Sequence, residues 1–178
     1  MKLEEIYVTK MSHDLAGTIG TLGNTVELFE IDASFVKEGT ALLKETTRVL
    51  TARLKFFRAL LGLETEITTD MGHNYLKTMT PLFSINGAVC QRVHLAFLLL
   101  ASEILLRGGI ITVLSDGVRC QGDKILLDDE KKAVLLGEKQ ILKPQYTSVL
   151  WLADYARQNQ KHIEIIQQDD FILFRIIP

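Results

Sequence analysis

The N-terminal part of the chain alternates apolar and polar positions with the spacing of two long helices. In the first run, apolar residues recur at steps of three and four, which is typical of a helix packed against other helices. They are Met11, Leu15, Ile19, Leu22, Val26 and Phe29. A second helix, capped by Asp32 or Ser34, repeats the pattern from Val36 to Leu61 and ends at Gly62. No proline precedes Pro81, so both helices can be long.

The second helix carries more apolar surface than one partner helix can cover. Beside its main stripe it has a second one, formed by Leu42, Val49, Phe56 and Leu60. Two such hairpins from two chains can bury these stripes together as a four-helix bundle. The pattern therefore predicts an N-terminal antiparallel helical hairpin over 1–64 that forms a homodimer.

After Gly62 the pattern changes to helices mixed with short β-branched runs. The predicted helices are 68–80, 92–106 and 146–158, and the predicted strands are 84–89, 110–114, 118–127, 163–166 and 171–177. Asp116-Gly117 and Asp169-Asp170 are turn signals between consecutive strands. The fold class is therefore α+β, with the hairpin followed over 65–178 by an α/β sandwich in which helices cover one face of a largely antiparallel sheet.

Composition and charge exclude several classes of function. The chain has 178 residues, of which 47% are hydrophobic, and 20 Lys plus Arg against 22 Asp plus Glu give a formal net charge of -2. The charges form no long run of one sign, so a nucleic-acid partner is not expected. Cys90 and Cys120 lie far apart without metal-ligand spacing, so we expect no metal site, no cofactor of the chain's own and a reducing cytoplasm.

A membrane partner is not expected either. The most apolar stretch, 95–106, is interrupted by Ser102 and Glu103 and is shorter than the ~20 residues of a membrane span. The acidic Glu4 and Glu5 do not fit a signal peptide. These features predict a cytoplasmic protein.

His13 lies on the wrong face of its helix for a core residue. At ~100° per residue it is roughly 160° around the helix from Leu15, and its own face continues through Gly17, Gly20 and Asn24. Each helical glycine costs about 1 kcal/mol relative to alanine, so a requirement for a bare surface would explain them. Such a surface would let another protein approach an exposed imidazole. Alternatively, the glycines permit a tight helix crossing, or this segment is not helical, and His13 is an ordinary surface residue.

Two separated motifs resemble one family. His13-Asp14-Leu15, followed by Gly20, Asn24 and Glu27-Leu28, resembles the phospho-acceptor helix of bacterial histidine phosphotransferases of the ChpT type. The segment 53–58, Arg-Leu-Lys-Phe-Phe-Arg, resembles that family's Arg-Leu-x-Phe-Phe-Arg signature. The order of elements after Gly62 is also similar to the family's second domain. The family usually has Ser or Thr and then Pro where this chain has Gly17 and Thr18.

This resemblance implies a role in a phosphorelay. His13 would accept a phosphoryl group from the aspartate of one receiver domain, in a hybrid histidine kinase, and pass it to the receiver of a response regulator. Neutral imidazole is a good nucleophile near pH 7, and the receiver would supply Mg²⁺ for the transfer. Asp14 could orient the imidazole or tune its basicity. The rival interpretation is a dimeric adaptor that binds a regulator or kinase without being phosphorylated.

The returning helix brings cations near the level of His13. Thr51 is level with His13 across the hairpin, and Arg48 and Lys55 lie within about one turn of it. Together with Gly17, Gly20 and Asn24, Arg48 and Lys55 could dock an acidic receiver surface, although each could equally be a solvated cation. The sequence does not distinguish docking from ion pairing within the bundle for Arg53 and Arg58.

The second part resembles the ATPase domain of histidine kinases without its nucleotide motifs. The helix 94–106, followed by Gly108 and Gly109, looks like the one that normally carries Asn-Leu-Leu-x-Asn-Ala. Here the corresponding stretch, 97–102, reads Phe-Leu-Leu-Leu-Ala-Ser, and Asp116-Gly117 is not followed by the further glycine of Asp-x-Gly-x-Gly. The resemblance thus implies a degenerate domain that neither binds ATP nor supports kinase activity.

Overall fold

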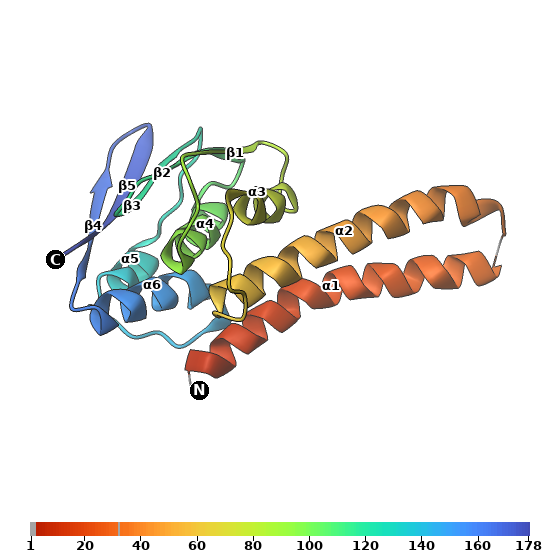
Figure 1. Cartoon of the computed structure of the whole chain (residues 1–178), viewed down its shortest axis with the longest axis horizontal. Helices are drawn as coiled ribbons and strands as arrows, with labels where there is room; N and C mark the ends of the chain where they lie inside the picture. Colours follow the sequence, from red (N-terminus) through yellow and green to blue (C-terminus); the bar gives the residue numbers. More distant parts are fainter. Residues whose placement is uncertain (1–2, 32) are drawn as a thin grey trace.

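The N-terminal part forms a long antiparallel helical hairpin. The computed structural model describes residues 3–31 and 33–178. Helix α1 covers Leu3–Ile31, a 3₁₀ turn η1 covers Ala33–Phe35, and α2 covers Val36–Leu60 (Figure 1). The two predicted helices are confirmed, and the first begins earlier than the periodicity indicated. Of the two predicted caps, Asp32 lies outside the described residues, and Ser34 lies inside the 3₁₀ turn, so α2 begins after Phe35 without a side-chain cap.

The α/β part contains every element that the sequence predicted, and in addition one short helix and one 3₁₀ turn. The elements are α3 (Thr69–Lys77), β1 (Phe83–Asn86), α4 (Arg92–Ile104), β2 (Gly109–Val113), β3 (Gly117–Gln121), α5 (Asp129–Leu135), η2 (Pro144–Tyr146), α6 (Thr147–Gln158), β4 (His162–Gln167) and β5 (Phe171–Ile177). The strand predicted to reach residue 127 ends at Gln121, and only Ile125 continues with an isolated bridge to Leu105. The additional helix, α5, begins at Asp128, whose carboxylate accepts from the Lys131 backbone N–H at 2.7 Å.

The five strands form one sheet in the order β1-β2-β3-β5-β4. Only β1 and β2 pair in parallel, and the other three pairs are antiparallel, as predicted. Helices α4, α5 and α6 lie on one side of this sheet (Figure 1). Gly117 is required where β3 meets β5, because a Cβ there would lie 1.9 Å from the Phe174 carbonyl oxygen. The α+β class is thus confirmed.

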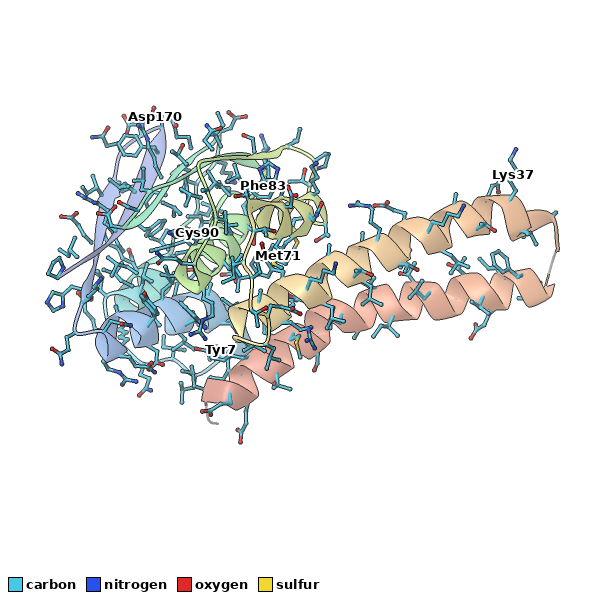
Figure 2. The ribbon with its side chains drawn as sticks, in the orientation of Figure 1. Tyr7, Lys37, Met71, Phe83, Cys90 and Asp170 are labelled. Carbon is cyan, nitrogen blue, oxygen red and sulfur yellow. The ribbon has the colours of Figure 1, made fainter. Side chains whose placement is uncertain are left out.

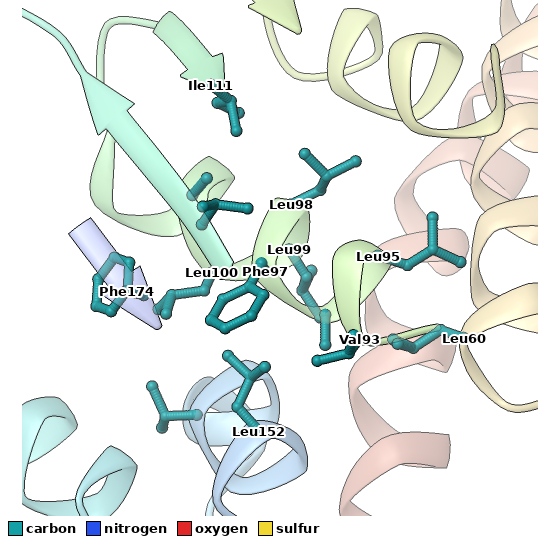
Figure 3. Packing of buried hydrophobic residues seen from close by; sticks show 14 of the residues in the cluster. Leu60, Val93, Leu95, Phe97, Leu98, Leu99, Leu100, Ile111, Leu152 and Phe174 are labelled. Atoms are coloured by element: carbon teal, nitrogen blue, oxygen red, sulfur yellow. The ribbon is translucent and has the colours of Figure 1, made fainter. Parts of the chain in front are cut away.

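The hydrophobic core surrounds α4. Ten of the thirteen residues of this helix are buried. Phe97 points toward Leu152 of α6 and Phe174 of β5, while Leu95 extends from α4 toward the helices of the hairpin (Figure 3). Within the described ranges, no helix is both long enough and apolar enough to cross a membrane.

The base of the hairpin is anchored to the α/β part by an aromatic cluster. Phe56 and Phe57, from the Arg-Leu-Lys-Phe-Phe-Arg segment, are buried, and Phe56 stacks on Tyr75 of α3 with ring centroids 3.7 Å apart. Ile6 of α1 is fully buried at the same end. The far end, near Lys37, projects away from the sheet and its helices (Figures 1 and 2). The two parts therefore share a core only near the chain's N-terminus.

Candidate functional site

His13 stands on the open face of α1. Its side chain is 87% exposed, as the helical angle predicted. A Cβ added at Gly17 or Gly20 would meet nothing within 4 Å, and Asn24 is exposed on the same face. Thus the glycines serve no close approach within this chain. They leave a smooth strip of helix backbone beside the imidazole.

Asp14 lies close to the imidazole but is bound by Lys10. Its side chain is only 11% exposed, and the Lys10 Nζ lies 3.0 Å from each of its carboxylate oxygens. The Nδ1 atom of His13 is 3.6 Å from Asp14 Oδ1, which is beyond hydrogen-bond distance. The orienting hydrogen bond considered for Asp14 is therefore not made in this structure. What remains is a carboxylate close to the ring whose charge Lys10 balances.

A groove runs between α1 and α2 beside His13. Its volume is about 380 Å³. The lining residues are His13, Asp14, Gly17, Thr18, Thr21, Glu45, Thr46, Val49 and Arg53. The sequence placed Thr51 of α2 level with His13. The α2 residues of the groove, 45–53, lie on both sides of that position, as expected. The missing side chain of Gly17 keeps the groove open next to the imidazole.

Arg48 and Lys55 lie beside this groove and do not line it. Arg48 binds Glu45 with two hydrogen bonds, of 2.9 Å from Nε and 2.6 Å from Nη2. These bonds hold the pKa of Glu45 below its ordinary value. Lys55 is exposed. The structure thus brings Gly17, and not these two cations, into contact with the groove, and a docking role for Arg48 and Lys55 stays a prediction.

Arg53, whose role the sequence left open, is the cation that the fold brings to the site. Its Nη1 donates to the Asp14 carbonyl at 2.8 Å, and its Nε donates to Thr78 Oγ1 at 3.1 Å. Arg58 instead pairs with Glu64 at 2.6 Å. One arginine of the segment therefore reaches the histidine turn, and the other forms an ion pair beyond the end of α2.

The α/β part contains a second polar cluster, far from His13 in the sequence. Glu103 of α4 accepts from Ser148 Oγ at 2.7 Å and from Lys131 Nζ at 3.3 Å. Burial raises the pKa of Glu103, while Lys131 and Ser148 oppose this shift. No group of three or more His, Cys, Asp or Glu residues that could hold a metal ion occurs in the part of the chain that the structure describes.

Comparison with known proteins identifies the fold. No family model matches this chain, and no curated protein matches it. Among solved structures, that of a bacterial phosphotransferase superposes with a TM-score of 0.80, covering 98% of this chain and 95% of that chain at 20% sequence identity. The histidine kinase domain of a blue-light activated kinase from Erythrobacter litoralis EL346 covers 96% of this chain with a TM-score of 0.38, a value too low to support an argument. The chain therefore shares the fold of a bacterial phosphotransferase over nearly its whole length.

Proposed function

We propose that this chain is a cytoplasmic histidine phosphotransferase of a bacterial phosphorelay. It takes a phosphoryl group from the aspartate of one receiver domain, in a hybrid histidine kinase, onto His13 and passes it to the receiver of a response regulator. The observation that carries this proposal is the high solvent exposure of the His13 imidazole on a helix face that also carries two glycines. The fold shared with a bacterial phosphotransferase supports it.

The chemistry needs only a neutral, accessible imidazole. A ring nitrogen of His13 attacks the phosphorus of the aspartyl phosphate, the N–P bond forms, and the O–P bond breaks to release the carboxylate. Transfer to the second receiver reverses these steps. The receiver supplies Mg²⁺ and a lysine that neutralise the charge of the transferring group, so the chain needs no metal of its own.

In-line transfer requires the receiver to approach His13 closely. Reacting atoms must come within about 3–3.5 Å, so the receiver surface has to lie almost on α1. Gly17 and Gly20 present no side chain on this approach, and Asn24 is a short polar residue one turn further. On the neighbouring helix, Lys55 is exposed, and Arg48 would have to exchange its partner Glu45 for an acidic group of the receiver. The bare strip thus explains why poor helix formers occupy these positions.

A second copy of the chain fits the opposite face of the hairpin. Val8, Ile19 and Val26 of α1 are 48–55% exposed, and Leu54 of α2 is 42% exposed. Ile19 and Val26 are seven residues apart and share a face, which lies about 140° around the helix from His13 at ~100° per residue. A homodimeric four-helix bundle would bury this apolar face. His13 would then remain free for a receiver.

The α/β part acts in this proposal as a scaffold without nucleotide chemistry. The helix that resembles the asparagine-bearing helix of kinases is instead an apolar core helix, α4. Its carboxylate Glu103 is engaged by Lys131 and Ser148. A ligand that binds only the native state raises its melting temperature, so ATP with Mg²⁺ should leave this melting temperature unchanged.

Phosphoryl transfer from labelled receivers tests the proposal. The protein is mixed with a panel of receiver domains carrying a ³²P-labelled aspartyl phosphate, and the label acquired by the chain should be acid-labile and base-stable. His13→Gln should abolish labelling and keep the melting temperature, because an exposed side chain contributes little packing. His162→Gln, at another exposed histidine, is the matched control. Undiminished label in His13→Gln would refute the assignment, and receiver binding without any label would establish an adaptor.

A further inference from the structure

Arg53 joins three elements that meet beside His13. From α2, its Nη1 donates to the Asp14 carbonyl of α1 at 2.8 Å and lies 3.4 Å from Thr18 Oγ1. Its Nε donates to Thr78 Oγ1 at 3.1 Å, and its Nη2 donates to the Thr78 carbonyl at 3.3 Å. Thr78 is the C-terminal cap of α3. A single guanidinium thus bridges the turn that carries His13 and the first helix of the α/β part.

The bond to α1 fixes the histidine turn. The Asp14 carbonyl belongs to the residue directly after His13, and a carbonyl oxygen has two lone pairs, so it can accept from Arg53 in addition to the helix's own donor. Thr18, one turn further, is 9% exposed and lies against the same guanidinium. A charged donor on the inner side of this turn holds the outer side, with His13, in one orientation relative to α2.

The bonds to α3 are held by the aromatic cluster. Thr78 Oγ1 donates to the Tyr75 carbonyl at 2.7 Å, so its lone pairs remain available to Arg53. The ring of Tyr75 stacks on Phe56, three residues after Arg53 on α2. The position of Thr78 is therefore determined by the packing of the α/β part against the hairpin. A shift in that packing would therefore move the Thr78 atoms to which Arg53 donates.

We infer that Arg53 is a positioning residue for phosphotransfer, which transmits the placement of the α/β part to His13. This inference rests on the proposed function. In this inference Arg53 acts through its hydrogen bond to the backbone of α1, and not as a group that takes part in the reaction. The planar guanidinium of Arg53 has donors on several edges, so it can donate to acceptors on α1 and at Thr78 at the same time. The single ammonium group of a lysine cannot do so. The α/β part would then be needed for the rate of transfer although it supplies no reacting atom.

The test compares Arg53→Lys with Arg58→Lys. Both changes exchange arginine for lysine within the same segment of α2, but Arg58 pairs with Glu64 and not with the histidine turn. The initial rate of transfer is measured against receiver concentration, and the imidazole resonances of His13 are recorded by NMR. Because small displacements of a reacting group slow transfer strongly, Arg53→Lys should lower kcat by about 10-fold or more. KM should stay within about twofold, and the His13 resonances should move. Arg58→Lys should leave kcat, KM and the His13 resonances unchanged.

A second variant keeps the inference falsifiable if Arg53→Lys does not fold. Thr78→Val removes one acceptor on α3 and leaves the other contacts of Arg53, so it should lower kcat in the same direction by a smaller factor. Normal kcat and unmoved His13 resonances in folded Thr78→Val, or in folded Arg53→Lys, would overturn the inference. An equal loss in Arg58→Lys would also overturn it. If the unmodified protein acquires no label from receivers, the proposed function itself fails, which is a different outcome.

Discussion

The hairpin and the α/β part differ in how they use apolar surface. In α4, ten of thirteen residues are buried, whereas the buried side chains described in α1, a helix of 29 residues, are Ile6, Thr18 and Thr25. Two of these three are threonines, and the Thr25 hydroxyl donates to the Thr21 carbonyl at 2.7 Å. The α/β part is thus held together by its own core. In the hairpin, Val8, Ile19 and Val26 remain exposed on one face of α1 while Gly17 and Gly20 lie on another, which is expected of an element that works by contact with other molecules.

The core of the α/β part should respond most strongly to mutation. Leu99 of α4 is 1% exposed, and Leu99→Ala should lower the free energy of unfolding by about 2–5 kcal/mol, because it removes buried methyl groups and leaves a cavity. Denaturant unfolding followed by circular dichroism measures this change. Leu82→Ala, at a residue that is 68% exposed, should remain within about 0.5 kcal/mol of the unmodified protein. Equal losses in both variants would show that the contrast in burial has no energetic consequence.

Mutations on the apolar face of the hairpin should affect dimer formation. Val26→Asp places a carboxylate on the apolar face of α1, and burying an unpaired charge in a bundle is costly, so the variant should be monomeric at micromolar concentration. Sedimentation equilibrium measures the mass. Asn24→Asp adds the same charge on the opposite face and should leave the dimer intact. A dimeric Val26→Asp variant would show that the second copy does not use this face.

The glycine strip can be tested by a change with opposite expected effects on stability and transfer. Gly20→Arg should block phosphotransfer, because a long side chain would stand where the receiver approaches. Arginine is a better helix former than glycine by most of ~1 kcal/mol, so the melting temperature should hold or rise. Gly20→Ala should retain transfer. A destabilised or monomeric Gly20→Arg variant would show that the glycine serves the bundle, and a stable dimer with normal transfer would place the receiver elsewhere.

The smallest expected effect is a pH dependence of the free energy of unfolding, which arises from His94 in the α/β part. His94 is buried, and its Nδ1 accepts the Cys90 backbone N–H at 3.3 Å. Burial lowers the pKa of His94 from 6.5, so the folded state binds fewer protons than the unfolded state below that value. Stability contributed by the neutral ring is complete above this pH and is lost as pH falls toward the folded-state pKa. Urea unfolding at several pH values should show this loss, and His94→Gln should reduce it. An identical pH slope in the variant would assign the effect to other groups.

The sequence by itself determined the elements and the exposure of His13. Hydrophobic periodicity reflects which side of a segment is buried, so it predicted the hairpin, the positions of the strands along the chain and the side of α1 on which His13 lies. It missed α5, because a helix of seven residues gives too short a periodic signal. The sequence did contain a local sign of this helix. Asp128 is a typical N-cap residue, and its carboxylate accepts from the backbone N–H of Lys131, three residues later.

Only the tertiary structure decided what surrounds His13. Asp14 is adjacent in sequence, yet it is bound by Lys10 and makes no hydrogen bond to the ring. Arg53 contacts Asp14, Thr18 and Thr78, which are 39, 35 and 25 residues away in the chain. The spacing of residues along one helix carries no information about such contacts, because they depend on how helices pack side by side. The contacts of Arg53 could therefore be found only once α1, α2 and α3 were placed together.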